Sequence, residues 1–142
     1  MNYEDRKIVA VIASNVSAEE ALNVIGHLAV AVGKYSDAEI MGRPVITDKS
    51  GVEHMGISQF PFIVTKVKAG KLKNAIEKAK SNPNLLVADY PREILETRTD
   101  DDLADAIEAK ENDKFEYMGA IIYGNTKDVD EITGKFSLWR ID

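Results

Sequence analysis

The segment KIVAVIA, residues 7–13, constrains the fold more than any other part of the sequence. Seven residues suit one strand, and the run is rich in β-branched side chains and apolar at almost every position. A strand that is apolar on both faces must be covered on both faces. The sequence therefore predicts a buried inner strand at its start.

Helical and extended segments alternate after this strand. Ser17 and Glu20 have the spacing of a capping box, apolar residues then recur every three or four positions from Ala21 to Val32, and Gly33 is a typical stop. The same reasoning predicts strands at 61–67, 85–89, 115–123 and 136–139 and helices at 71–81 and 127–133, the last capped by Thr126. A further short acidic helix, capped by Thr99 or Asp100, is predicted to run through Lys110. This order predicts an α/β fold with helices on both faces of the sheet.

Residues 43–57 break the alternation. Two short extended candidates flank Asp48-Lys49-Ser50-Gly51, which has the composition of a turn. We therefore expect one domain over residues 1–142, with a surface hairpin inserted at 43–57.

Composition excludes several classes of function. The chain has no cysteine, which rules out disulfides, thiolate metal sites and thiol nucleophiles, and its two histidines are far apart without metal-ligand spacing. Phosphate-binding glycine motifs and the nucleophile elbow are absent. The first residues lack the pattern of a secretory signal, and no apolar run reaches the length that spans a bilayer. We expect a cytoplasmic protein without a metal or a cofactor.

Charge is distributed unevenly in this acidic chain of net charge −6. Residues 61–80 hold six basic side chains and one acidic one. The segment is either a solvated face or a surface that contacts the phosphates of tRNA. The candidate contact residues are Lys66, Lys68, Lys71, Lys73 and Lys78.

His27 is the first candidate for chemistry. It lies at the edge of the apolar stripe of the first helix, so it is either a hydrogen-bonded histidine at the edge of the core or a ligand-binding and proton-relaying group. Asn23, one turn earlier, shares that face of the helix.

A second group of candidates follows the third strand. Asp89 ends that strand, where it can orient a base or simply pair with Arg92. Thr97, Arg98 and Thr99 either bind an anion or cap the helix that follows. The run Asp100–Asp102 is typical of a helix start rather than of a cation site.

Four blocks of the sequence together resemble a known family. They read KIVAVIASNVSAEEALNVIGHLAVAVG, FPFIVTKVKAGKLKNAIEKA, ETRTDDDL and YMGAIIYGNTKDVDEITGKFSLW, and they resemble the domain-of-unknown-function family number two thousand. That family in turn looks like a relative of the type II peptidyl-tRNA hydrolases. The resemblance implies a three-layer α/β/α fold around a mixed sheet of four to five strands.

The resemblance also implies where a site lies. The hydrolases use a lysine at the start of the first helix, a glutamine and a histidine within it, an aspartate after the third strand and a threonine beyond. His27 matches the histidine and Asp89 the aspartate, whereas Glu20 or Ala18 stands where the lysine is expected. A carboxylate in place of a cation reverses the charge, so the fold transfers more readily than the activity.

Three functions follow from these observations. The first is binding of a small ligand near His27 and Asp89, with hydrolase chemistry lost and with Asn23, Arg92, Thr97, Arg98 and Thr99 as further binding residues. The second is hydrolysis of aminoacyl- or peptidyl-tRNA esters. The third is a structural role as a homodimer, joined through Phe136, Trp139 and the hairpin.

Overall fold

The computed structural model describes residues 1–141 and contains a mixed five-stranded sheet. The strands lie in the order β5-β6-β1-β4-β7. The central strand β1 (Arg6–Ala13) runs parallel to β4 (Phe62–Val67) and antiparallel to β6 (Tyr117–Asn125). At the edges, β5 (Leu86–Pro91) pairs with β6, and the short β7 (Ser137–Leu138) pairs with β4. Residues 8–13 are buried, which confirms the predicted inner strand.

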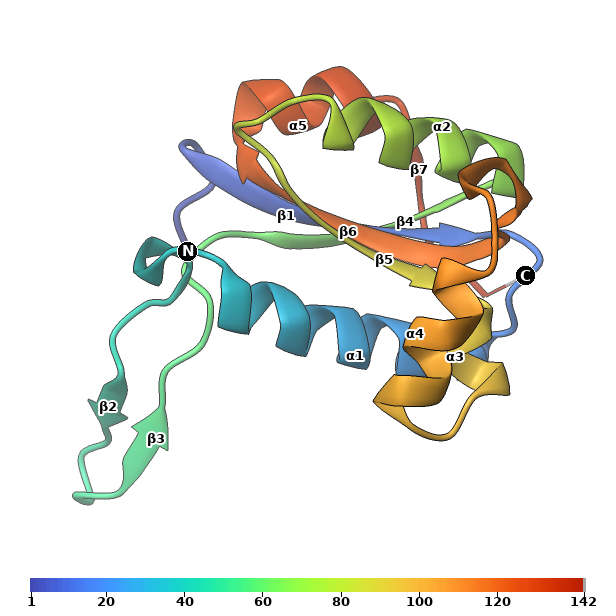
Figure 1. The fold of residues 1–142 in the computed structure, drawn as a ribbon. Coiled ribbons are helices and arrows are strands. Elements are labelled where there is room, and N and C mark those ends of the chain that lie inside the picture. Colours follow the sequence, from blue (N-terminus) through green and yellow to red (C-terminus); the bar gives the residue numbers. More distant parts are fainter. Residues whose placement is uncertain (142) are drawn as a thin grey trace.

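Helices cover both faces of this sheet, as predicted (Figure 1). One face carries α1 (Ala18–Tyr35), with α3 (Glu93–Glu96) and α4 (Asp100–Glu108) beside it, and the other carries α2 (Ala69–Lys80) and α5 (Thr126–Thr133). Each long helix buries one stripe of apolar residues. On α1 these are Ala21, Val24, Leu28 and Val32, and on α2 they are Leu72, Ala75, Ile76 and Ala79. The sheet therefore separates the molecule into an α1 side and an α2 side.

Local hydrogen bonds set the helix starts. The predicted capping box of α1 is present, because the Ser17 hydroxyl accepts from the backbone N–H of Glu20 and the Glu20 carboxylate accepts from that of Ser17. These bonds lower the pKa of Glu20 below its ordinary value. The predicted cap of α5 was wrong by one residue. Asn125 accepts from the Asp128 backbone N–H, while the Thr126 hydroxyl donates to the carbonyl oxygen of Glu4.

The short helix α3 is not among the helices predicted from the sequence. A single helical turn is too short to show a hydrophobic period. Its residue Glu93 is 3% exposed and accepts a hydrogen bond from Lys110 Nζ at 3.1 Å, which ties this turn to the end of α4. This turn carries the chain from β5 out to α4.

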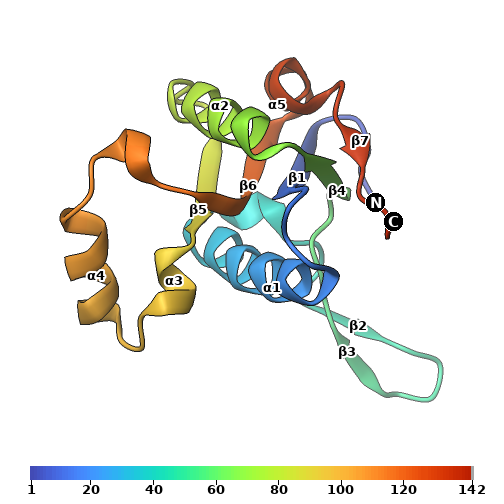
Figure 2. The same cartoon turned by 90° about the vertical axis from the view of Figure 1, so that its right-hand side faces the viewer.

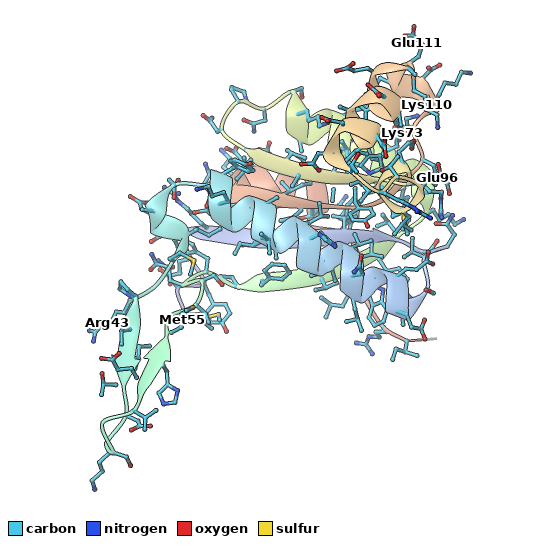
Figure 3. The ribbon with its side chains drawn as sticks, turned by 60° about the horizontal axis from the view of Figure 1, so that its bottom comes forward. Arg43, Met55, Lys73, Glu96, Lys110 and Glu111 are labelled. Atoms are coloured by element: carbon cyan, nitrogen blue, oxygen red, sulfur yellow. The ribbon has the colours of Figure 1, made fainter. Side chains whose placement is uncertain are left out.

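The hairpin arm, residues 43–57, extends away from the layered body (Figures 1 and 3). Its strands β2 (Val45–Thr47) and β3 (Glu53–Met55) form a sheet of their own. Gly51 turns the chain with a φ of 86°, which favours glycine, and at the base a Cβ on Gly56 would lie 1.6 Å from the carbonyl oxygen of Arg43. Residues 43–57 thus contain a hairpin whose paired strands are shorter than the two extended segments that flank Asp48–Gly51.

Additional 3₁₀ turns lie at Ala38–Ile40 (η1) and Asn112–Lys114 (η2). Within residues 1–141, no helix is both long enough and apolar enough to cross a bilayer.

Candidate functional site

A cleft of about 490 Å³ opens on the α1 side, between α1, the end of β5 and the segment that leads into α4. Five of the seven predicted site residues line it: His27, Asp89, Thr97, Arg98 and Thr99. The fold thus brings together two segments that are some sixty residues apart in sequence. The volume falls in the range that small-molecule sites occupy, about 300–1,000 Å³.

His27 faces the cleft because its neighbour Leu28 occupies the buried stripe of α1. Its ring lies 6.3 Å from the ring of Tyr90 on β5. Tyr90 is 1% exposed, and burial raises the pKa of its phenol. The phenol donates to Asn23 Oδ1 at 3.4 Å. Asn23 therefore contacts Tyr90, which lines the cleft, and is not itself a lining residue.

Although Asp89 is among the residues that line the cleft, its carboxylate is turned toward α2 and away from His27. Alternate residues of a strand point to opposite faces of the sheet, so Asp89 and its neighbour Tyr90 face different sides. Asp89 pairs with Lys80 of α2 at 2.5 Å, and Arg92 pairs with Glu116 at 3.2 Å, so the predicted alternative of an Asp89–Arg92 pair was wrong. Desolvation acts to lower the pKa of Lys80, but the hydrogen bond and charge of Asp89 outweigh it and raise that pKa.

The two threonines at the cleft have local partners. The Thr97 hydroxyl donates to the Glu93 carbonyl oxygen at 2.8 Å, and the Thr99 hydroxyl accepts from the Asp102 backbone N–H at 3.1 Å. Thr99 is therefore the cap of α4, as one of the two readings predicted. Arg98 is exposed and has no ion-pair partner among residues 1–141. The charged donor available to a ligand here is the Arg98 guanidinium.

The remaining walls of the cleft are mainly apolar, apart from Asp100 and Tyr90, and include residues that the sequence did not single out. Ile94 of α3 and Leu103 of α4 join Ala31 and Ala88 around it. Their signal in the sequence is weak. Ile94 and Leu103 lie in short acidic segments, and Ala31 and Ala88 lie in apolar runs where nothing marks them as cleft residues. The cleft thus combines apolar and polar lining residues.

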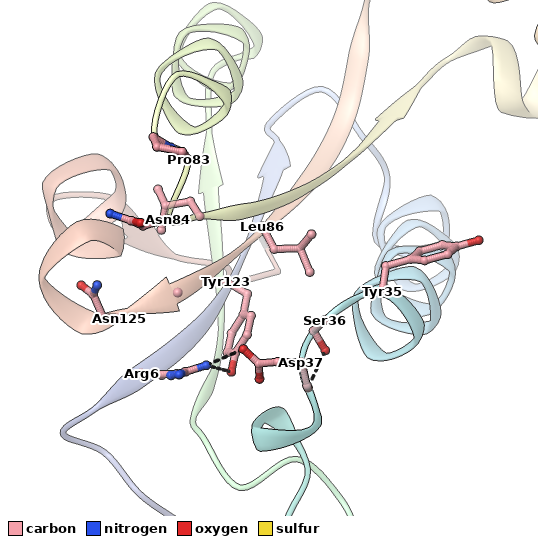
Figure 4. A pocket seen from close by; sticks show the side chains of 11 residues that line it. Arg6, Tyr35, Ser36, Asp37, Pro83, Asn84, Leu86, Tyr123 and Asn125 are labelled. Atoms are coloured by element: carbon pink, nitrogen blue, oxygen red, sulfur yellow. Dashed lines mark hydrogen bonds and ion pairs between the residues drawn. The ribbon is translucent and has the colours of Figure 1, made fainter.

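A second pocket, of about 420 Å³, surrounds Arg6 and Tyr123 (Figure 4). Arg6 Nη1 lies 2.7 Å from Asp37 and donates to the Tyr123 hydroxyl at 3.0 Å, and Nη2 lies 2.8 Å from Glu39. The bonds to Tyr123 and Asp37 raise the pKa of Arg6. Because its cation is already paired with two carboxylates, this pocket offers a ligand less unsatisfied charge than the cleft.

The predicted tRNA-contact lysines lie on or beside the α2 side. Lys71 and Lys78 line a pocket of about 530 Å³ between α2 and α5, and Lys68 lines a smaller one next to it. Lys66 and Lys73 donate to the backbone carbonyl oxygens of Arg140 and Asp113. The sheet separates the lysines of α2 from the cleft at His27 (Figure 1).

The described residues 1–141 hold no cluster of three side chains suited to a metal ion.

This architecture, a mixed sheet between two helical layers with a cleft at the end of an edge strand, defines an α/β domain with a candidate small-molecule site. The DUF2000 family of proteins of unknown function matches residues 6–140, and the chain belongs to that family.

A solved structure shows the same fold. It is that of a protein of unknown function, Atu0240, from Agrobacterium tumefaciens strain C58, with a TM-score of 0.81 and 21% sequence identity. The match covers 96% of this chain and 98% of that one. No curated protein matches the sequence.

Proposed function

We propose that the protein binds a small organic anion in the cleft on the α1 side. The observation that carries this proposal is the combination of a mainly apolar cleft of about 490 Å³ with an arginine, Arg98, that forms no ion pair among residues 1–141. Ligand sites are typically apolar cavities with a few polar groups that fix the orientation of the ligand. The cleft has both components.

The lining indicates the chemistry of the ligand. Leu28, Ile94 and Leu103 would contact an apolar body, and the guanidinium of Arg98 would pair with a carboxylate or phosphate group. His27 lies at the same cleft and can donate to or accept from a polar substituent. A small carboxylic acid or organic phosphate with an apolar portion fits this arrangement.

A thermal-shift screen with carboxylic acids, amino acids and organic phosphates tests the proposal. A ligand at about 100 times its Kd adds ~2.7 kcal/mol to stability, which raises the Tm by several degrees. We expect at least one compound of this class to do so with the wild-type protein.

Two cleft variants and one matched control make the screen specific. Arg98→Ala and His27→Ala should abolish or reduce the shift, whereas Lys127→Ala, which removes an exposed cation from α5 across the sheet, should retain it. A panel without any active compound, or a shift that Arg98→Ala leaves unchanged, would contradict the proposal.

The resemblance to type II peptidyl-tRNA hydrolases makes ester hydrolysis the alternative to test. The geometry supports it less, because Glu20, which stands where a lysine is expected, is engaged in the capping box, and the Asp89 carboxylate pairs with Lys80. We expect no cleavage of peptidyl-tRNA at enzyme excess. Cleavage that Asp89→Asn and His27→Ala both abolish would establish the hydrolase instead.

Contact with tRNA through the basic segment is a separate prediction, since its α2 lysines and the cleft lie on opposite sides of the sheet. Lys71 and Lys78 have no carboxylate partner among residues 1–141, so they are free to meet phosphates. A gel-shift titration with tRNA tests this contact, and replacement of both lysines by alanine should weaken any binding and its dependence on salt.

A further inference from the structure

We infer that the hairpin arm of one copy docks on the outer face of α1 in a second copy, so that the protein forms a symmetric dimer. The inference is independent of the ligand proposed for the cleft. It rests on two uncovered apolar surfaces that belong to the same chain.

The first surface is the α1 outer face, which comprises Leu22, Gly26, Val30 and Gly33. All four residues are exposed and follow the spacing of one helical face, and Leu22 and Val30 are each 74% exposed. Residues 21–33 contain no Asp, Glu, Lys or Arg, although such residues make up 30% of the chain. A solvent-facing helical surface without charge is unusual and indicates a contact with another molecule.

The second surface is the hairpin arm itself. Its strands pair with each other, and neither packs extensively on a helix or on the five-stranded sheet among residues 1–141. Val45 and Met55 face each other across the strands and are 49% and 88% exposed, while Ile46 is 56% exposed. An isolated two-stranded hairpin is at best marginally stable in water, so an apolar arm of this kind needs a partner.

The placement of the two surfaces favours a second copy as that partner. Both views of the fold show the arm extending beyond the body on the α1 side (Figures 1 and 2). A two-fold axis on this side would lay each arm over the α1 of the other copy. Such an interface is self-complementary, because each chain supplies one arm and one helix.

Charge agrees with a second copy. The chain carries a net charge of −6, yet the arm balances Arg43 and Lys49 against Asp48 and Glu53, and the α1 outer face has no charge. Two acidic copies can therefore meet there without strong repulsion.

The exposed apolar side chains of the two surfaces would supply the contact area of the dimer, and a standard interface buries about 800 Å² on each partner. They are Leu22, Val30, Val45, Ile46, Val52, Met55 and Ile57.

The arrangement differs from the interface predicted from the sequence. Phe136 and Trp139 are partly buried against the core, and Lys66 Nζ lies 5.1 Å from the Trp139 ring. These aromatic side chains belong to the edge of the core near β7. Of the interface predicted from the sequence, only the hairpin arm is kept. In the inferred dimer it contacts the α1 outer face of the other copy.

Sedimentation equilibrium over a range of protein concentrations tests the dimer. The wild-type protein should shift from the 15.7 kDa monomer to twice that mass. Val30→Glu should weaken the association more than tenfold, while Asn74→Glu, which adds the same charge to an exposed position of α2, should not. A monomer at every concentration, or equal effects of the two variants, would overturn the inference.

Cross-linking tests which surfaces meet. Because the chain has no cysteine, differently tagged Val30→Cys and Met55→Cys proteins can be mixed and oxidised. We expect the disulfide between the two variants to exceed the disulfide within either one. Dominant links between two copies of the same variant would show a different dimer and would also overturn the inference.

Discussion

The two long helices, α1 and α2, bury similar apolar faces, but their exposed faces differ in charge. Each packs a regular stripe of apolar residues on the sheet. Outward, α2 presents Lys71, Glu77 and Lys78, whereas α1 presents an uncharged stripe that ends at Gly33. Both the candidate cleft and the uncovered apolar surfaces lie on the α1 side. The inner faces of the helices therefore explain the fold, and the difference between their outer faces is the basis of the proposal that contacts form on the α1 side.

The largest expected effect is the difference in free energy of unfolding between substitutions on the inner and the outer face of α1. Leu28 is 4% exposed and Leu22 is 74% exposed. Leu28→Ala should lower the free energy of unfolding by about 2–5 kcal/mol through lost packing, and Leu22→Ala in dilute protein by no more than about 0.5 kcal/mol. Urea unfolding measures both. A cost at Leu22 equal to that at Leu28 would show that the outer face is covered within the monomer.

The next effect concerns the arm. A Cβ at position 56 would collide with the Arg43 carbonyl, so Gly56→Ala should disrupt the base of the hairpin. We expect self-association to weaken more than tenfold, equivalent to ~1.4 kcal/mol, while the body unfolds at nearly the same urea concentration. Gly70→Ala, where an added Cβ meets nothing within 4 Å, is the control on α2. Unchanged association in Gly56→Ala would count against the role of the arm.

A smaller effect distinguishes the two sides of β5. Because Asp89 pairs with Lys80 on the α2 side, Asp89→Asn should cost about 1 kcal/mol of stability or less and leave ligand binding in the cleft unchanged. Calorimetric titration of a ligand found by the screen measures this. A large loss of affinity would contradict this prediction and show that the Asp89 side chain contributes to ligand binding.

The smallest effect is a change in the pH dependence of stability. Burial raises the pKa of Tyr90 in the folded protein above its ordinary value of 10.0. The unfolded chain therefore loses this proton first, so the contribution is complete below about pH 10 and is lost as the pH rises through the folded value. Tyr90→Phe should make the alkaline loss of stability less steep in urea unfolding. An unchanged slope would indicate that Tyr90 titrates as an exposed phenol does.

Most of the fold could be predicted because its signals are local. The apolar run before Ala13 and the stripe from Ala21 to Val32 each reveal which faces are buried. The pairing of distant strands leaves no such local signal, and neither does the single turn of α3.

The candidate site was predicted in part for the same reason. His27 and Arg98 could be selected by residue type and position, and the fold brings them to one cleft. The direction of the Asp89 side chain could not be predicted, because it depends on whether the strand alternation starts toward α1 or α2. The exposure of the α1 outer face could not be predicted, because an uncharged stripe of a helix has the same sequence pattern whether it is buried or exposed.

Hydrogen exchange at low and high protein concentration tests most directly the claim that the α1 side is where this protein meets its partners. The account predicts that backbone amides of β2 and β3 and of the α1 segment exchange more slowly at high concentration, whereas those of α2 do not change. Exchange that is independent of concentration in the arm, or protection that appears on α2 instead, would contradict it.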